Sequence, residues 1–91
     1  MVKIEWAAPA VADLTAIVDY IADDNPDAAL ALMDQIQTRV SGLGTQPAMG
    51  RKGRVTGTRE LVVRPNYIVV YAATPETVRV LRLLHAAQMW P

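Results

Sequence analysis

Residues 59–85 read RELVVRPNYIVVYAATPETVRVLRLLH, and this stretch decides the fold. Its middle run, from Tyr67 to Ala73, is continuously apolar, which predicts a central strand covered on both faces. Pro65-Asn66 precedes this run and Thr74-Pro75-Glu76 follows it, and residues of these types favour turns. Three strands joined by such short turns form an antiparallel meander. The predicted strands are residues 59–63, 67–73 and 77–85.

The segment before the meander, residues 45–58, reads TQPAMGRKGRVTGT. It is basic, rich in glycine and almost free of bulky apolar side chains, so we expect a surface loop. It lacks the Gly-Lys-Ser/Thr ending of a phosphate-binding P-loop, which argues against a nucleotide site of that kind.

Two amphipathic helices are expected upstream of this loop. Pro9 suits the start of a helix, where its missing N–H costs nothing. Asn25-Pro26 ends this helix and begins the next, because a residue before proline avoids the α region and asparagine caps helices well. Asp27 then lies at the positive end of the second helix dipole. The apolar stripes are Val11, Leu14, Ile17, Val18 and Ile21 in the first helix, and Ala29, Leu32, Met33, Ile36, Val40 and Leu43 in the second.

The opening residues, from Val2 to Trp6, alternate between apolar and charged side chains, which is the period of a half-buried strand. The element order is therefore β-α-α-β-β-β. Ninety-one residues suit one domain, spanning residues 1–91. We expect an α+β fold in which an antiparallel helical hairpin packs on one face of a mostly antiparallel sheet.

The composition excludes several classes of site. The chain has no cysteine and one histidine, so it cannot form a disulfide, a thiolate nucleophile or a conventional zinc site, and we expect neither metal nor cofactor. The N-terminus lacks the apolar core of a signal peptide. No apolar stretch approaches the ~18–20 residues that span a bilayer. We expect a soluble cytoplasmic protein that does not bind membranes.

The net charge of zero hides an asymmetry between the two halves of the chain. Residues 1–45 carry two basic and seven acidic side chains, whereas residues 46–91 carry seven basic and two acidic ones, so the halves have charges of −5 and +5. A basic half favours an anionic partner, either nucleic acid or an acidic peptide. The alternative is a dipolar surface without a function.

The element order and three segments together resemble the RelE/ParE superfamily of bacterial toxins. The segments are GTRELVV at 57–63, YIVVY at 67–71 and VLRLLH at 80–85, and the similarity runs from Val2 to Trp90. The resemblance implies the toxin of a type II toxin–antitoxin module, neutralised by a cognate antitoxin. Such antitoxins join a DNA-binding N-terminal region to a C-terminal segment that wraps the toxin. RelE-like members cut messenger RNA at the ribosome, and ParE-like members poison DNA gyrase.

The residues present favour the ParE-like branch. Metal-free RNA cleavage needs a base, cations at the phosphate and an acid for the leaving oxygen. The resemblance implies basic residues in the loop, an arginine after the first tyrosine of the Tyr-x-x-x-Tyr strand, and arginine and tyrosine near the C-terminus. The loop fits, but Ile68 follows Tyr67, and residues 85–90 read HAAQMW. We therefore expect inhibition of DNA gyrase without catalysis; the alternatives are a ribosome-dependent mRNA endoribonuclease and an inactive partner-binding module.

Candidate site residues follow from both readings. On the nuclease alternative the catalytic residues are Lys52, Arg54, Arg82 and His85. The candidates for binding an anion or a partner are Arg51, Lys52, Arg54, Arg59, Arg82 and Trp90.

For several of these side chains, a purely structural role is an alternative to the functional one. His85 could be an acid/base or close the last strand with a backbone hydrogen bond. Arg59 could contact an anion or protect a sheet edge, and Trp90 could cap the core or anchor a partner. Strand parity puts Arg79 and Arg82 on opposite faces of the sheet, so one of them must snorkel or form an ion pair, for which Glu60 is a candidate. Trp6 and Tyr71 are read as packing residues.

Overall fold

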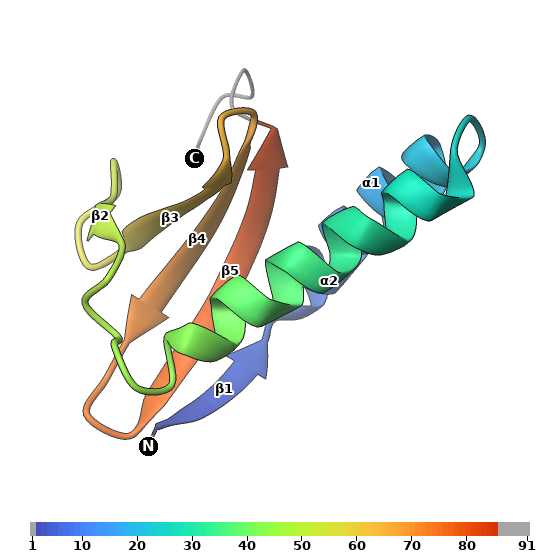
Figure 1. Ribbon diagram of the computed structural model, residues 1–91. Coiled ribbons are helices and arrows are strands. Elements are labelled where there is room, and N and C mark those ends of the chain that lie inside the picture. The colour runs from blue at the N-terminus through green and yellow to red at the C-terminus, as the bar shows by residue number, and fades with distance from the viewer. Residues whose placement is uncertain (1, 86–91) are drawn as a thin grey trace.

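The computed structural model describes residues 2–85 and contains two helices and five strands in an α+β arrangement (Figure 1). The elements are β1 (Lys3–Trp6), α1 (Ala8–Ala22), α2 (Pro26–Gly42), β2 (Arg51–Lys52), β3 (Arg59–Arg64), β4 (Tyr67–Ala73) and β5 (Thr77–His85). The predicted helical hairpin and meander are confirmed. The loop prediction for residues 45–58 is wrong at one point, because the short strand β2 pairs with the start of β3.

The sheet has the strand order β1-β5-β4-β3-β2. Neighbouring strands are antiparallel except β1, which runs parallel to β5. β4 lies in the middle, as its continuous apolar run predicts, and its residues 68–71 are buried. The sheet is therefore built around β4, and β1 extends it on the far side of β5.

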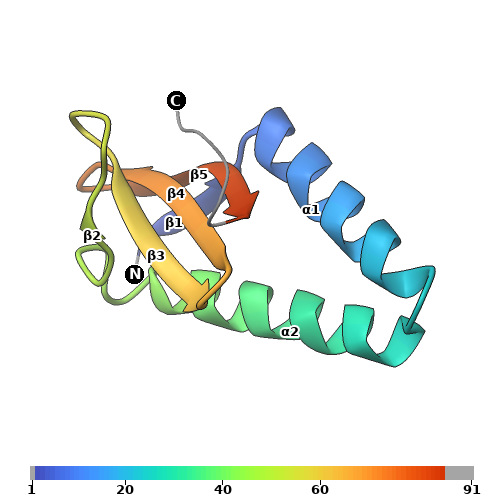
Figure 2. The same ribbon diagram turned by 90° about the horizontal axis from the view of Figure 1, so that it is seen from above.

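The corner between the helices forms as its sequence predicts. Asn25 has an extended backbone conformation, and its side chain accepts a hydrogen bond of 3.1 Å from the N–H of Ala28. Pro26 occupies the first turn of α2, and Asp27 faces the helix dipole there. Figures 1 and 2 show that this corner, the tip of the hairpin, projects away from the sheet.

The core lies between the hairpin and one face of the sheet. It is built from α2, β3, β4 and β5, and α1 contributes Ala10 fully and its other apolar side chains in part. The stripe predicted for α2 is buried apart from Met33, but α1 is turned, so that Ala10 lies inside and Val11 is exposed. The small side chain of Ala10 allows close contact with the sheet. The fully buried core residues of α2, β4 and β5 include Leu32, Ile36, Val69, Tyr71, Val78 and Val80.

Two leucines of α2 provide a matched test of this packing. Leu32 is fully buried, whereas Leu30 is 56% exposed. We expect Leu32→Ala to lower the free energy of unfolding by about 3 kcal/mol, because it removes buried methyl groups and leaves a cavity. Leu30→Ala should change it by less than about 0.5 kcal/mol. Urea denaturation followed by circular dichroism measures both, and equal effects would contradict the described packing.

Candidate functional site

A basic loop, residues 50–59, joins the edge strand β2 to β3 and carries four of the predicted site residues. Residues 52–59 and Ala73 line a hollow of about 460 Å³. Arg51, Lys52 and Arg54 are exposed. Gly57 has a φ of +87°, a conformation that glycine adopts without strain. The loop thus displays several cations around one open hollow.

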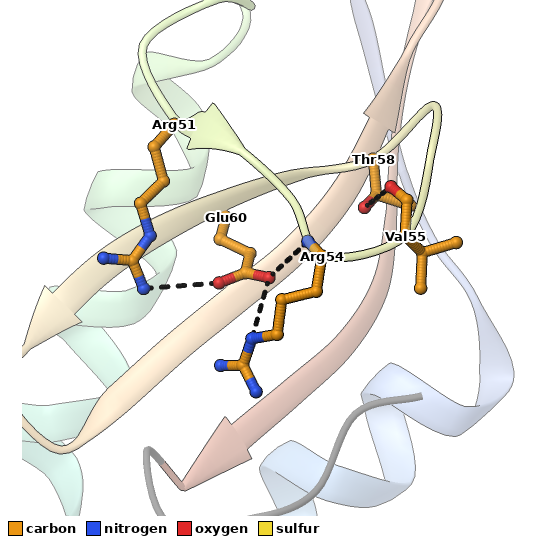
Figure 3. A network of polar contacts seen from close by, with 5 residues as sticks. All are labelled: Arg51, Arg54, Val55, Thr58 and Glu60. Carbon is orange, nitrogen blue, oxygen red and sulfur yellow. Dashed lines mark hydrogen bonds and ion pairs between the residues drawn. The ribbon is translucent and has the colours of Figure 1, made fainter.

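Glu60 organises this loop from beneath (Figure 3). Its side chain is only 2% exposed, although it is a carboxylate. One carboxylate oxygen lies 3.3 Å from Arg51 Nη2; the other accepts a hydrogen bond of 3.1 Å from the backbone N–H of Arg54 and lies 3.4 Å from Arg54 Nε. A buried carboxylate needs compensating charge and donors, and the loop supplies both.

These contacts set the protonation state of Glu60. Burial by itself raises the pKa of a carboxyl group, but here the hydrogen bonds from Arg54 and Arg51 and the positive charges of both residues outweigh it. The pKa of Glu60 is therefore below its ordinary value. Glu60 stays anionic near neutral pH, which makes it a poor proton acceptor for catalysis.

Backbone contacts stabilise the two ends of the loop. The buried Tyr71 hydroxyl accepts a 2.9 Å hydrogen bond from the N–H of Gly50 and donates one of 2.7 Å to the carbonyl of Pro47. A Cβ at residue 50 would lie 2.7 Å from that hydroxyl, so the close approach requires glycine. At the other end, Thr58 Oγ1 donates to the carbonyl of Val55 at 2.6 Å. These hydrogen bonds tie the start of the loop to β4 and close the turn before β3.

Arg59 makes backbone contacts that the sequence did not predict. Its Nη1 donates hydrogen bonds to the carbonyls of Gly50, at 2.8 Å, and Ala48, at 3.4 Å. The guanidinium thus ties the start of β3 to the segment that enters the loop. Its position beside the hollow leaves it part of the cationic lining.

Arg82 lies in an internal ion pair rather than beside the basic loop. Its Nε and Nη2 donate to the two carboxylate oxygens of Asp13 in α1, at 2.7 and 3.0 Å. The hydrogen bond to Asp13 raises the pKa of Arg82. Asp13 also accepts a 3.0 Å hydrogen bond from the backbone N–H of Leu83. β1 pairs only with residues 77–80 of β5, so Asp13 supplies an acceptor beyond the end of β1.

The prediction that Arg79 and Arg82 point to opposite faces is wrong. Arg79 pairs with Ala72 and Arg82 with Val70, two residues apart on β4 and hence on one face. Leu81 is an extra residue on β5, and this bulge reverses the alternation. Neither arginine forms the proposed ion pair with Glu60. Arg82 pairs with Asp13, and the Arg79 guanidinium lies 3.9 Å from the Glu5 carboxylate.

His85 lies at the other end of the sheet from the basic loop. It is opposite Tyr67, and the two rings meet edge to face with centroids 5.7 Å apart. It is three residues beyond Arg82, which corresponds to about 10 Å along a strand. Trp90, the last predicted partner contact, lies outside the described residues. The structure thus groups Arg51, Lys52, Arg54 and Arg59, and separates them from His85.

The sequence did not predict the structural roles of three residues: the hydrogen-bond acceptors Asp13 and Glu60, and Tyr71, which holds the loop. Asp13 is one of six aspartates in the helical hairpin, so nothing in the sequence marks it as the partner of Arg82. Tyr71 was read as packing alone, although its hydroxyl holds the loop. Glu60 gave a signal, because a lone carboxylate in the apolar run of a predicted strand requires a partner when buried.

In residues 2–85, no cluster of three or more histidine, cysteine, aspartate or glutamate side chains could hold a metal ion. Neither α1 nor α2 has the length and apolarity needed to cross a bilayer.

Known proteins resemble this chain along nearly its whole length. Residues 4–90 match the family model of the ParE toxin of the type II toxin–antitoxin system parDE. The chain is 41% identical to putative toxin Y4kP of Sinorhizobium fredii, covering 98% of this chain and 93% of that protein. It is 38% identical to toxin RelE2 of Caulobacter vibrioides, covering 98% and 100%. A chain of the chromosomal ParDE TA system from P. aeruginosa shares the fold, with a TM-score of 0.83 and 26% identity over 93% of this chain and 96% of that one.

The Glu60 network leads to a pH-dependent prediction. We expect Glu60→Gln to lower the free energy of unfolding at pH 7 by about 1 kcal/mol, since it removes charged hydrogen bonds to partly exposed arginines. Because the folded pKa of Glu60 is lowered, its contribution is present above the unfolded value of about 4.3 and is lost as pH falls through the folded value. The difference between the two proteins should therefore shrink below about pH 4.

Urea denaturation at several pH values measures this difference. Glu76→Gln is the matched control, because Glu76 is exposed in the turn before β5 and should show little effect at any pH. A Glu60→Gln penalty that stayed constant down to pH 2 would show that the carboxylate charge contributes nothing.

Proposed function

Because this chain belongs to the ParE toxin family of type II toxin–antitoxin systems, we propose that it inhibits bacterial growth by binding DNA gyrase and that a cognate antitoxin neutralises it. The membership agrees with the RelE/ParE resemblance expected from the sequence. The single observation that carries the toxin assignment is the family match over residues 4–90. The choice of gyrase depends on the side chains of the site.

The chemistry of the site supports inhibition by binding rather than by RNA cleavage. Ile68, at the position where the nuclease branch is expected to carry an arginine, is buried in a small apolar cluster with Val70 and Leu84. Arg82 is hydrogen-bonded to Asp13, and Glu60, the acidic group beneath the basic loop, is held anionic. A base, an acid and cations that converge on one phosphate are what a metal-free nuclease requires. The described residues do not offer that combination at the loop.

One observation favours the second candidate, a ribosome-dependent mRNA endoribonuclease. The Caulobacter relative, 38% identical, bears the name toxin RelE2. On this alternative Lys52 and Arg54 would hold the phosphate, and Arg82 and His85 would assist the proton transfers. Both targets lie in the cytoplasm, where we expect the protein to act.

The partner we propose for the basic loop is the antitoxin. Arg51, Lys52 and Arg54 are exposed, and Lys52 and Arg54 line the hollow. The charge of these three side chains suits an acidic segment of a partner protein. A second part of the antitoxin would bind DNA, as the family resemblance implies. The same cations would serve the target when the antitoxin is absent.

Two assays with purified protein test the target. We expect it to inhibit supercoiling by DNA gyrase and to leave a message intact in cell-free translation, as read by primer extension. Lys52→Ala should weaken the inhibition by roughly threefold or more, because it removes an exposed cation from the hollow. The control Lys3→Ala removes an exposed lysine of β1 and should inhibit like the unaltered protein.

The opposite pattern would overturn the choice of gyrase. Codon-spaced cuts in the message, absent with Lys52→Ala or His85→Ala, together with normal supercoiling, would establish the ribonuclease alternative. Growth that continues normally during overproduction in a sensitive bacterium would contradict the toxin assignment itself.

A further inference from the structure

The tip of the helical hairpin is acidic and far from the basic loop. Asp19, Asp23, Asp24 and Asp27 are all exposed there. Within residues 2–85 none of these four carboxylates forms an ion pair, whereas Asp13, further back on α1, is paired with Arg82. Arg39, the one basic residue of the two helices, lies near the other end of α2 and donates to the carbonyl of Val62. The tip therefore has concentrated negative charge.

An exposed aromatic side chain stands within this acidic region. Tyr20 is 81% exposed, the largest value among the large exposed hydrophobic side chains of residues 2–85. A tyrosine that is left in water in a free protein offers a large apolar area and a hydroxyl to a partner, and tyrosine is enriched among the residues that dominate binding energy.

Tyr20 separates two hollows of different chemistry. One, of about 280 Å³, is lined by Ala16, Ile17, Tyr20, Tyr67 and His85. The other, of about 660 Å³, is lined by Tyr20, Ile21, Asp23, Asp24, Asn25 and Ala28. The first is mainly apolar and its far wall is fixed by the edge-to-face pair of Tyr67 and His85. The second carries two carboxylates. Side by side, they fit a segment that has an apolar side chain next to a positive charge.

We propose that Tyr20 and these two hollows dock a segment of the antitoxin in which an apolar side chain neighbours a lysine or arginine. The apolar side chain enters the hollow of Ile17 and Tyr67, and the cation lies beside Asp23 and Asp24. This inference rests on the proposed function, because it takes the antitoxin as the partner.

The negative charge of the hairpin tip indicates which kind of antitoxin segment binds there. An acidic segment laid along the hairpin would meet like charge at the tip, which costs free energy, so acidic residues of the partner are confined to the basic loop. The antitoxin would then carry opposite charges on the segments that reach the two ends of the toxin. Such an arrangement also fixes the direction in which the antitoxin chain crosses the toxin.

Isothermal titration calorimetry with the product of the adjoining open reading frame tests the site. We expect Tyr20→Ala to weaken binding by roughly 30-fold or more, in line with loss of a buried aromatic anchor. Asp23→Asn combined with Asp24→Asn should weaken it roughly fivefold at low salt, and this loss should fade at high salt because the ion pair is near the surface. Tyr20 and both aspartates are exposed, so the variants should fold, which circular dichroism and the urea midpoint verify.

Matched controls come from α2. Leu30→Ala removes another exposed apolar side chain and Asp34→Asn another exposed carboxylate, and neither residue lines the two hollows. Both should bind within about twofold of the unaltered toxin. Loss of affinity confined to the tip variants supports the docking site.

Three results would overturn the proposal, and they separate it from the proposed function. If tip variants and unaltered toxin bind the antitoxin equally, the docking site is wrong and the toxin–antitoxin assignment stands. If the unaltered toxin neither binds that product nor is neutralised by it, the proposed function and the site fail together. If sedimentation shows a dimer that Tyr20→Ala dissociates, the occupant is a second copy of this chain.

Discussion

The buried carboxylate of Glu60 is the interaction on which the rest of the site depends. A carboxylate on a strand in the sheet can stay charged there only if donors and cations surround it. The chain supplies them by folding residues 51–54 back over β3, so that Arg51 and Arg54 approach Glu60. The need to compensate one buried charge therefore determines where the exposed cations of the loop stand. Tyr71 and Arg59 form hydrogen bonds with the backbone of Gly50, at the start of the loop. Lys52 takes no part in these contacts and is exposed, like Arg51 and Arg54.

A second internal ion pair connects the two layers of the fold. Asp13 of α1 binds the guanidinium of Arg82 and the backbone N–H of Leu83, where β1 no longer accompanies β5. This contact occupies a half-buried arginine that the sequence alone offers as an anion contact. It also removes one of the six aspartates of the hairpin from the acidic surface. Exposed cations remain in the basic loop, and four exposed carboxylates remain at the hairpin tip.

Segregated charge bears directly on how such a small toxin can be both active and controlled. A basic surface attracts an anionic target, and an antitoxin that covers the same surface must compete for it. An antitoxin that also holds a distant acidic and aromatic surface gains affinity without having to match the target at the basic loop. The two surfaces lie on different elements, one on the β2–β3 side of the sheet and the other at the tip of the hairpin (Figures 1 and 2). Their separation makes simultaneous contact depend on the length of the partner segment.

Local physics in the sequence determined the elements, and only the tertiary structure decided their alignment. The Asn25-Pro26 corner, the apolar run of β4 and the turns around it depend on neighbouring residues, so they could be predicted. The strand β2, the inward turn of Ala10 in place of Val11, and the bulge at Leu81 could not, because each depends on residues distant in the chain. A one-residue bulge reverses the faces of the side chains that follow it, and Arg82 pairs with Asp13, 69 residues away in the sequence. Charge content was thus fixed by composition, but which charges neutralise each other was fixed by packing.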